Sequence, residues 1–484
     1  MPHAGQALPK APTAAPACPP EPVLHPAPGA APRGSAATRH GAATRHGAAP
    51  GHGAAPGHAA APRSSRGVIP VSATLAANEA MAARRSRGHD LLPLAFGEAG
   101  LPVAASLRTA LAAASGRNGY GPVAGLPALR SAAAGYWQRR ALPTEPDAVI
   151  CGPGSKPLIF ALLLAIGEDV AVPCPSWVSY AAQAGLVGAR CHFVPIPAGE
   201  GGICDPARLA AAVRDARLAG RRIGAVIVTL PDNPTGRLAR PDTVRALCEV
   251  AEEHDLVIIS DEIYRDLIHD PAAAVLSPAA VTPHRTVVTT SLSKNLALGG
   301  WRCGVARMAD GPLGESLAGA LLGVGSEIWS SPSAPVQHAA AVAFGEPEDI
   351  VKRITRSRSL HASVVRAVAG RCAAAGLLVP PPQAAFYLYP DFEPWRGHLR
   401  DARGVTTGDG LARHLLERYG AGVLPASAFG ESSRALRVRI ATGLLYGDTD
   451  AQREAALQSA EPLRLPWIAA ALGRFGEILA DLAP

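Results

Sequence analysis

Lysine is scarce in this chain of 484 residues. The sequence contains 46 basic residues, of which only four are lysine, at positions 10, 156, 294 and 352. Arginine binds anions but stays protonated, so it cannot act as a nucleophilic amine. Any chemistry that needs an amine must therefore use one of the three lysines that lie beyond residue 66.

Paired cysteines and long apolar runs are also absent. The eight cysteines are scattered and form no CxxC motif, which indicates reduced thiols rather than a disulfide framework or a zinc site. The longest apolar stretch, residues 157–166, is about half the length that spans a bilayer. The first ten residues lack the apolar core of a secretory signal. We therefore expect a cytoplasmic protein with no metal site and no membrane contact.

The net charge of +7 does not indicate a nucleic-acid-binding protein. Residues 1–66 hold six basic residues and one acidic residue, so most of the excess lies there and the rest is nearly neutral. The same segment repeats a hexad related to AATRHG and is dominated by Ala, Pro, Gly and His. Such a composition buries too little apolar surface to offset the entropy of ordering. We expect residues 1–66 to form a disordered, low-complexity tail.

The remaining sequence has the pattern of an α/β protein. Buried β-branched runs that alternate with helical stretches predict a mostly parallel sheet between helices. The expected strands are 91–96, 169–173, 191–196, 224–230, 256–261, 286–293, 386–390 and 435–442. The expected helices are 70–86, 125–140, 155–166, 337–376, 408–419 and 450–458. We expect 120–330 to form a large domain, and 67–119 with 331–484 to form a smaller α+β domain.

Two polar motifs follow expected strands, where open α/β sheets bind ligands. GPGSKPL (152–158) places two glycines and Ser155 before a helix, an arrangement that suits a phosphate but also an ordinary turn. LPDNPTG (230–236) contains Asn233, which on its own is typical of a turn.

Two further motifs carry stronger chemistry. Asp261 ends an apolar strand in IISDEIYRDL, where a carboxylate needs a cation such as a protonated pyridinium or caps a helix. Lys294 follows another strand in TTSLSKNLALGGWRCG. If this lysine forms a Schiff base, Ser291, Ser293 and Arg302 are suited to bind a nearby phosphate.

Together the four motifs resemble the fold-type I pyridoxal 5′-phosphate (PLP) enzymes, and in particular the class I/II aminotransferases, over roughly residues 68–460. The resemblance implies that Lys294 holds PLP as a Schiff base and moves a proton between the substrate Cα and C4′. Asp261 would pair with the pyridinium nitrogen, while Tyr264 and Asn233 would bond the phenolic oxygen. Trp177 would stack on the ring. The phosphate ligands would be Ser155, Lys156, Ser291, Ser293 and Arg302.

The resemblance also implies substrate and partner contacts. Arg437, in ALRVRIATG, matches the arginine that binds the substrate α-carboxylate, and Gly97 and Asn233 would also contact the substrate. Tyr120, in NGYGPVAG, is similar to the tyrosine that reaches the phosphate of a partner subunit, which implies a homodimer. The substrates would be an amino acid and a 2-oxo acid.

Three positions depart from the family pattern. The substrate loop reads GEAG where many relatives have Gly-Glu-Pro-Asp, and Ala384 stands where glycine is usual. Arg439 replaces a small residue two places after Arg437, and alternate strand residues share a face. Arg439 would meet either a second anionic group of the substrate or a structural acid of the protein.

Other functions remain compatible with the same residues. A PLP lyase, oxidase or synthase would use the same constellation. A transcription regulator with an aminotransferase-like domain would need an N-terminal winged-helix module, for which residues 1–66 are too rich in Pro and Gly. A catalytically inactive scaffold is disfavoured because every cofactor position is filled. We expect a PLP-dependent aminotransferase.

Overall fold

The computed structural model describes residues 71–484, which belong to one compact unit, Val68–Pro484. The tail predicted for residues 1–66 lies outside the described residues. Within the described part, no helix has the length and apolar character needed to cross a membrane. The seven cysteines from Cys151 onward are all free thiols, as their scattered spacing predicts.

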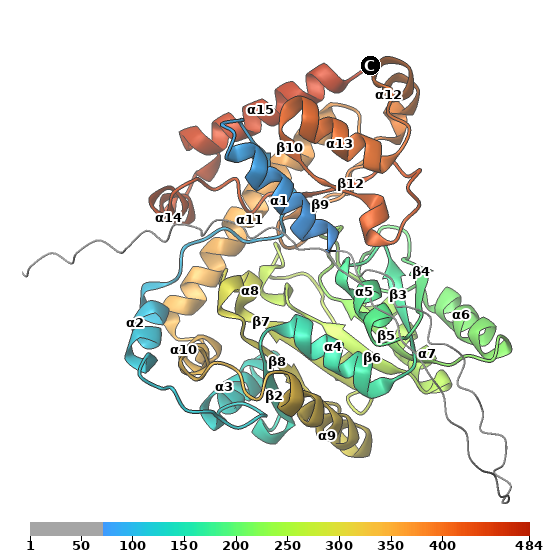
Figure 1. The fold of residues 1–484 in the computed structure, drawn as a ribbon, viewed down its shortest axis with the longest axis vertical. Coiled ribbons are helices and arrows are strands. Elements are labelled where there is room, and N and C mark those ends of the chain that lie inside the picture. The colour runs from blue at the N-terminus through green and yellow to red at the C-terminus, as the bar shows by residue number, and fades with distance from the viewer. Residues whose placement is uncertain (1–70) are drawn as a thin grey trace, which may run out of the picture. The chain divides into compact units, whose positions relative to one another are not determined.

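A seven-stranded sheet forms the centre of the fold (Figure 1). All of its strands run in the same direction except β8, which is antiparallel to both of its neighbours. Their spatial order is β2 (Val149–Gly152), β8 (Gly304–Arg307), β7 (Thr286–Ser291), β6 (Val257–Asp261), β5 (Ile223–Thr229), β3 (Asp169–Cys174) and β4 (Cys191–Pro195). The predicted mostly parallel sheet is confirmed.

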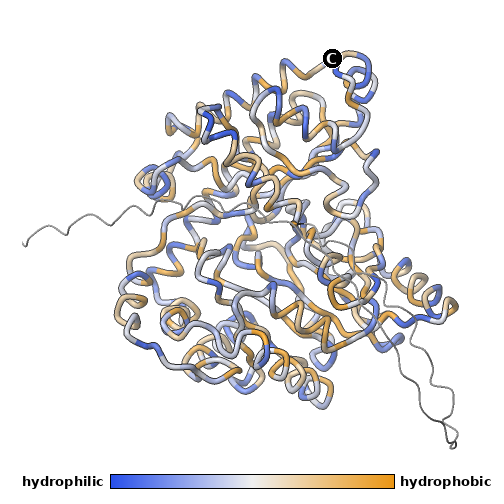
Figure 2. Tube along the Cα trace, viewed as in Figure 1, coloured by the Kyte–Doolittle hydropathy of each residue, from blue (hydrophilic) through white to orange (hydrophobic). Residues whose placement is uncertain are grey.

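Helices cover both faces of this sheet because its central strands are apolar on both sides. Every residue of β5 is buried, and the central strands carry mainly hydrophobic residues (Figure 2). One face packs against α4 (Ser155–Ile166), α5 (Ser179–Leu186) and α9 (Gly311–Ile328). The other packs against α6 (Pro206–Leu218) and α7 (Pro241–His254). A third group packs beside β2 and β7, namely α2 (Ala105–Ala114), α3 (Pro127–Gln138) and α10 (Ala334–Gly345).

Two smaller sheets lie in the other part of the fold. A parallel pair joins β1 (Leu92–Pro93) to β10 (Ala421–Gly422), and an antiparallel sheet has the order β11 (Leu424–Pro425), β12 (Val438–Ala441) and β9 (Tyr387–Leu388). The surrounding helices are α1 (Ala73–Arg85), α11 (Glu348–Ala374), α12 (Arg396–Arg403), α13 (Gly408–Tyr419), α14 (Asp450–Gln458) and α15 (Pro466–Leu482). The N-terminal segment thus joins the C-terminal segment through β1 and β10.

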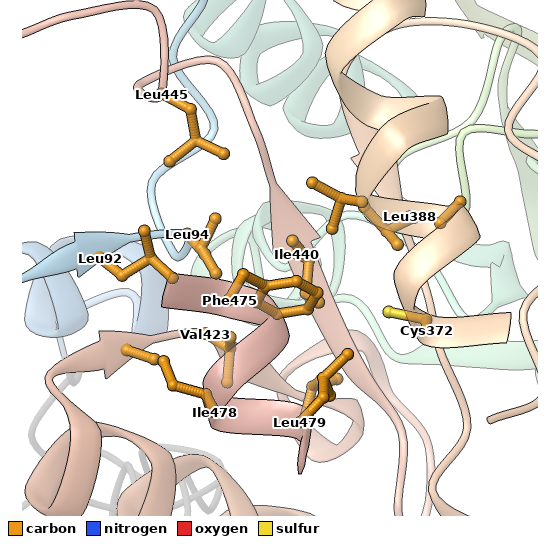
Figure 3. Packing of buried hydrophobic residues seen from close by; sticks show 14 of the residues in the cluster. Leu92, Leu94, Cys372, Leu388, Val423, Ile440, Leu445, Phe475, Ile478 and Leu479 are labelled. Carbon is orange, nitrogen blue, oxygen red and sulfur yellow. The ribbon is translucent and has the colours of Figure 1, made fainter. Parts of the chain in front are cut away.

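A second hydrophobic core holds these smaller sheets together. Leu92 and Leu94 meet Ile440 of β12 and side chains from α15 (Figure 3). Helix α11 contributes to this core through Cys372 and to the core around α3 through Ile350. It therefore connects the two parts of the fold.

Several predicted elements change in detail. The helix expected over 337–376 is two helices, α10 and α11, because Glu346 adopts a left-handed φ of 52° and Pro347 caps the next helix. Helices α2 and α10 pack with α3 in the core of the large sheet, so the predicted domain limits of 119 and 331 do not follow the packing. Strands β2, β8, β10 and β11 were not predicted, and no bounds were predicted for helices α2, α5–α9, α12 and α15.

Candidate active site

A cavity of about 570 Å³ opens at the carboxyl ends of the parallel strands. Its walls come from the loops after β2, β3, β5, β6 and β7, from Tyr387 and Arg439 of the small antiparallel sheet, and from the start of α1. Ten predicted site residues line it: Gly97, Ser155, Lys156, Trp177, Asn233, Asp261, Tyr264, Ser293, Lys294 and Arg302. Residues far apart in the sequence are therefore gathered at one edge of the sheet.

Lys294 lies in α8 (Leu292–Asn295), a single helical turn directly after β7. The turn begins because the Ser291 hydroxyl accepts a hydrogen bond from the Ser293 backbone N–H at 3.3 Å. The Lys294 ammonium donates a hydrogen bond to the Gly97 carbonyl. Burial, and then the positive charge of Arg439, lower the pKa of Lys294 to about 8. A lysine in this setting supplies a neutral amine near physiological pH.

Asp261 is the last residue of β6 and is only 3% exposed. Its carboxylate accepts hydrogen bonds from the Tyr180 hydroxyl at 2.9 Å and from the Thr289 hydroxyl at 3.4 Å. Burial raises the pKa of Asp261 to about 6, although the Tyr180 hydrogen bond opposes the rise. A buried carboxylate that is bonded to two hydroxyl groups and to the Ile263 backbone N–H, and that forms no ion pair among residues 71–484, is well placed to receive a cationic partner.

A polar network runs from Tyr264 to the small antiparallel sheet. The Asn233 side-chain amide donates to the Tyr264 hydroxyl at 3.3 Å, and its oxygen accepts from Arg439 at 3.2 Å. The Tyr264 and Tyr387 hydroxyls lie 3.0 Å apart. Gly97 must be small here, because an added Cβ would lie 2.6 Å from the Tyr387 hydroxyl. The network fixes donors on one side of the cavity.

An anion cradle lies at the start of α4. Gly154 has a φ of 104°, and Ser155 is the first residue of the helix, so backbone N–H groups face the cavity. Arg302 bonds the Gly299 carbonyl at 2.8 Å and the Pro153 carbonyl at 3.1 Å. A Cβ on Gly154 would collide with the Arg302 guanidinium, and a Cβ on Gly304 would collide with the Ser155 backbone nitrogen. Glycine therefore allows the arginine and the helix N-terminus to converge.

Trp177 and Lys156 form the wall beside the cradle. The Lys156 ammonium lies 4.9 Å from the centroid of the Trp177 ring, a cation–π distance. Burial and the charge of Arg302 lower the pKa of Lys156. The edge of Tyr180 packs against Trp177 with the ring centroids 5.1 Å apart, which orients the indole.

These residues fit PLP by the chemistry of their groups. The cradle suits a phosphate, Asp261 suits a protonated ring nitrogen, and Lys294 suits an aldehyde. The polar network of Tyr264 and Asn233 suits a phenolic oxygen. Each part of the cofactor thus has a matching group that comes from a different strand end.

The structure corrects the interpretation of Arg437. Its guanidinium forms ion pairs with Asp391 at 2.8 Å and with Glu431, and it does not line the cavity. Arg439 lines the cavity, is 1% exposed and pairs with no carboxylate among the described residues. The alternative that Arg439 meets a structural acid is therefore wrong. Asp391 and Glu431, which lie in other segments, bind Arg437. Arg439, two places later, enters the cavity.

Two other predicted residues lie outside the cavity. Ser291 is buried, does not line the cavity, and donates a hydrogen bond to the Ser293 hydroxyl at 3.0 Å. Tyr120 is 91% exposed, so it contacts no group of the cavity within its own chain.

Tyr180 and Tyr387 were missed by the sequence interpretation. Tyr180 lies three residues after Trp177, but Trp177 precedes α5 (Ser179–Leu186), so no helical spacing relates the two side chains. Tyr387 lies in the expected strand 386–390, two residues before Tyr389, but no local signal marks its face.

The departure in the substrate loop has a steric reason. Gly100 adopts a left-handed φ of 59°, and a Cβ there would collide with the Gly443 carbonyl. A Cβ on Gly443 would in turn collide with the Glu98 carbonyl. The two glycines allow the loop and the end of β12 to touch. Ala384 is the second position that departs from the family pattern. The residue with a left-handed φ there is its neighbour Ala385, with a φ of 55°.

Comparisons with known proteins agree with this geometry. Residues 90–451 match the family described as aminotransferase class I and II. A probable aspartate/prephenate aminotransferase from Thermus aquaticus is 32% identical over 378 residues, which cover 77% of this chain and 92% of that protein. An aspartate aminotransferase from Geobacillus stearothermophilus is 31% identical over 394 residues, which cover 79% of this chain and 95% of that protein.

Solved structures support the same conclusion. An aspartate aminotransferase from Thermus thermophilus with maleate has a TM-score of 0.71 and 28% identity, covering 85% of this chain and 97% of that one. The fold and the cofactor expected from the motifs are confirmed, and transamination is supported over the other PLP reactions. The chain therefore belongs to the class I and II aminotransferases, and it is a PLP-dependent transaminase acting on an amino acid and a 2-oxo acid.

Proposed function

We propose that this transaminase prefers dicarboxylic amino acids and 2-oxo acids, with Arg439 binding the α-carboxylate and Lys156 the distal carboxylate. One observation carries this proposal. Four cationic side chains line the cavity, and none of them pairs with a carboxylate within residues 71–484: Lys156, Lys294, Arg302 and Arg439. Two carboxylates, Glu98 and Asp261, also line the cavity. Because the four cationic side chains outnumber them, the cavity favours anionic ligands.

The four cations divide among the groups that must bind. Lys294 is required by the cofactor aldehyde, and Arg302 with the start of α4 is suited to the cofactor phosphate. Arg439 offers a planar guanidinium that binds a carboxylate through two parallel hydrogen bonds. Lys156 then remains without an anionic partner. A second carboxylate on the substrate would supply one.

The relatives support a dicarboxylate. Aspartate and prephenate, which appear in the names of the relatives, each carry two carboxylates. Maleate, named with the Thermus thermophilus structure, is also a dicarboxylate.

The residues of this chain divide the chemical work in a consistent way. PLP supplies an aldehyde that condenses with amines and a ring that takes up electrons from the substrate Cα. Asp261 keeps the ring nitrogen protonated, while Tyr264 and Asn233 donate to the phenolic oxygen. Lys294 Nζ accepts the proton of the substrate Cα, for which a pKa of about 8 is suited because part of the amine is neutral at physiological pH. Arg439 orients the substrate so that its Cα–H faces Lys294.

An amino-donor and keto-acceptor screen with two variants tests the substrate assignment. For Arg439→Lys, we expect kcat/KM to fall about a hundredfold for every amino acid, since a buried charge pair loses its geometry. For Lys156→Met, we expect a fall of about tenfold for dicarboxylic donors only, the size of one charge-assisted hydrogen bond. Lys352→Met is the matched control, because Lys352 is exposed and pairs with Glu348. A uniform loss for mono- and dicarboxylic donors in Lys156→Met would refute the distal-carboxylate role.

We also propose a homodimer in which Tyr120 reaches the phosphate of the partner subunit. Its 91% exposure leaves the hydroxyl free for another chain, and the adjacent Gly121 N–H is anchored to the Ser331 hydroxyl at 3.3 Å. Mixing the inactive variants Tyr120→Ala and Lys294→Ala tests this, because a hybrid dimer would contain one intact site. No recovery of activity in hybrids shown to form would contradict the shared site.

Two smaller assignments complete the proposal. We place the enzyme in the cytoplasm, which the seven free cysteines support and cell fractionation tests. We assign β1, β9–β12 and α11–α15 to a small domain and the large sheet with α2–α10 to a large one, which the separate cores support.

A further inference from the structure

Arg437 occupies a specific position although it is outside the cavity. It bridges two acids from different segments, Asp391 after β9 and Glu431 after the 3-10 helix η6 (Ala426–Phe429). Its side chain is 39% exposed, whereas those of Asp391 and Glu431 are 17% and 13% exposed. Ion pairs with an exposed partner add little to stability. We therefore expect Arg437 to act by holding its neighbours in position rather than by raising the stability of the fold.

A continuous series of contacts leads from Arg437 to Arg439. Glu431, held by Arg437, accepts a hydrogen bond from the Tyr389 hydroxyl at 2.8 Å. The Tyr389 ring packs edge-on against Phe429 with the centroids 5.9 Å apart. The Arg439 guanidinium lies 5.2 Å from the Phe429 ring centroid. Each contact joins a polar or aromatic group whose orientation depends on the previous one.

Arg439 depends on such contacts because it has no carboxylate partner. Its hydrogen bonds go to the Asn233 side chain and the Ala95 carbonyl, and its Nε has none. The guanidinium is held between the rings of Phe429 and Tyr387, the latter 5.0 Å away. A shift of Phe429 would therefore move or tilt the guanidinium plane.

The segment that contains Phe429 and Gly430 also contacts the cofactor side of the cavity. The Phe429 carbonyl accepts a hydrogen bond from the Ser176 N–H at 3.0 Å, one residue before Trp177. Gly430 has a φ of 90°, and a Cβ there would collide with Phe193 of β4. The segment is thus fixed to the large sheet at one end and to Arg437 at the other.

We propose that Arg437 is a positioning residue that sets the orientation of Arg439 through Glu431, Tyr389 and Phe429. This inference rests on the proposed function, in which Arg439 binds the α-carboxylate. A misplaced binding group weakens substrate binding and also loses part of the alignment between the substrate Cα–H and Lys294. Loss of Arg437 should therefore raise KM for every amino acid, lower the turnover number less than it raises KM, and leave the cofactor spectrum unchanged.

Steady-state kinetics of Arg437→Met, Tyr389→Phe and the double variant test this role. We expect KM for amino acids, and the inhibition constant of succinate as a probe, to rise about tenfold in each single variant. Because both changes interrupt one series of contacts, the double variant should show about the same rise as either single one. Arg437→Lys, which keeps the charge, should recover part of the affinity. Arg464→Met, which removes an exposed ion pair with Glu461, is the control.

The outcomes separate this inference from the proposed function. If Arg439→Lys leaves KM unchanged, the carboxylate assignment itself fails. If Arg439→Lys raises KM but Arg437→Met does not, only the positioning role fails. Additive effects in the double variant, or a loss of turnover and melting temperature with KM unchanged, would also overturn the positioning role and indicate a structural one.

Discussion

Tyr180→Phe tests how the protein prepares Asp261 for the cofactor. The hydroxyl of Tyr180 is fully buried and donates to Asp261 at 2.9 Å. Phenylalanine keeps the ring, and with it the edge contact to Trp177, so the substitution removes little beyond the hydroxyl. The deleted interactions are the hydrogen bond to the buried Asp261 carboxylate and the one with the Thr229 hydroxyl at 2.9 Å; the first of them bears on the cofactor.

A hydrogen bond to a charged group contributes about 1.5–3 kcal/mol. Asp261 keeps the longer bond from Thr289, so we take the lower end, which corresponds to about a tenfold loss of cofactor affinity. The pH dependence should change as well. Burial raises the pKa of Asp261 to about 6 and the Tyr180 hydrogen bond opposes this rise, so its loss moves the pKa further upward. The cofactor affinity that depends on ionised Asp261 is lost as the solution is acidified through the pKa of this residue. In the variant, this loss therefore begins at a higher pH.

Pyridoxamine phosphate is the suitable ligand, because it binds without a covalent bond to Lys294. Its dissociation constant from the apoenzyme is measured by calorimetry across a pH series. Tyr136→Phe is the matched control, since Tyr136 is a buried tyrosine that donates to Asp266 at 3.1 Å outside the cavity. Equal affinities and equal pH profiles for the two variants would refute the role assigned to Tyr180.

Three further substitutions have defined outcomes. Lys294→Ala should abolish the absorbance of the aldimine between PLP and the lysine yet still bind pyridoxamine phosphate; an unchanged PLP spectrum would overturn the assignment of the lysine. Gly154→Ala should weaken pyridoxamine phosphate binding, because its Cβ meets Arg302, whereas Gly167→Ala at the other end of α4 should affect only stability. Burial raises the pKa of Asp232 to about 7 from 3.8, so the folded state loses stability as pH rises through this interval. Asp232→Asn should therefore raise the free energy of unfolding by up to about 4 kcal/mol at high pH and by nothing below about pH 4; equal gains at both pH values in thermal melts would exclude this cause.

The sequence pattern predicted correctly those helices and strands whose ends or apolar runs are clearly marked by local residues. Helix α4 has the predicted bounds, 155–166, because glycines with a positive φ, Gly154 and Gly167, stand at its two ends. The fully buried runs of β5 and β6 are continuous and β-branched, and they were also predicted. Strands β2 and β8 were missed, since each has only four residues and they pair with each other across more than 150 positions of sequence.

The candidate site was predictable where one residue follows one strand. Asn233, Asp261 and Lys294 each follow a parallel strand, so the sheet alone brings them to the same edge. Tyr180 was not predictable in this way, because its contact with Asp261 spans 81 positions and depends on how α5 packs against the sheet. Its role appears only after tertiary packing is known.

The exchange between Arg437 and Arg439 shows a limit that a single strand imposes. Residues two apart on a strand point to the same face, so the pattern alone could not decide which arginine enters the cavity. The decision is made by two acids, Asp391 and Glu431, which lie in other segments and bind the first arginine. A carboxylate-binding arginine must be free of protein acids, and that condition is a property of the three-dimensional structure.

The positions of the few lysines are explained by the same cavity. Of the three lysines beyond residue 66, Lys352 is an exposed partner of Glu348, and the other two line the cavity. Arginine supplies positive charge almost everywhere else in the sequence, so charge alone does not explain two lysines in one site. The cofactor aldehyde needs an amine that can lose its proton, and Lys294 supplies this amine whereas arginine could not. Lys156 lies beside Arg302 and Trp177 with its pKa lowered, and in the proposed function its compact ammonium is the group that binds the distal carboxylate of the substrate.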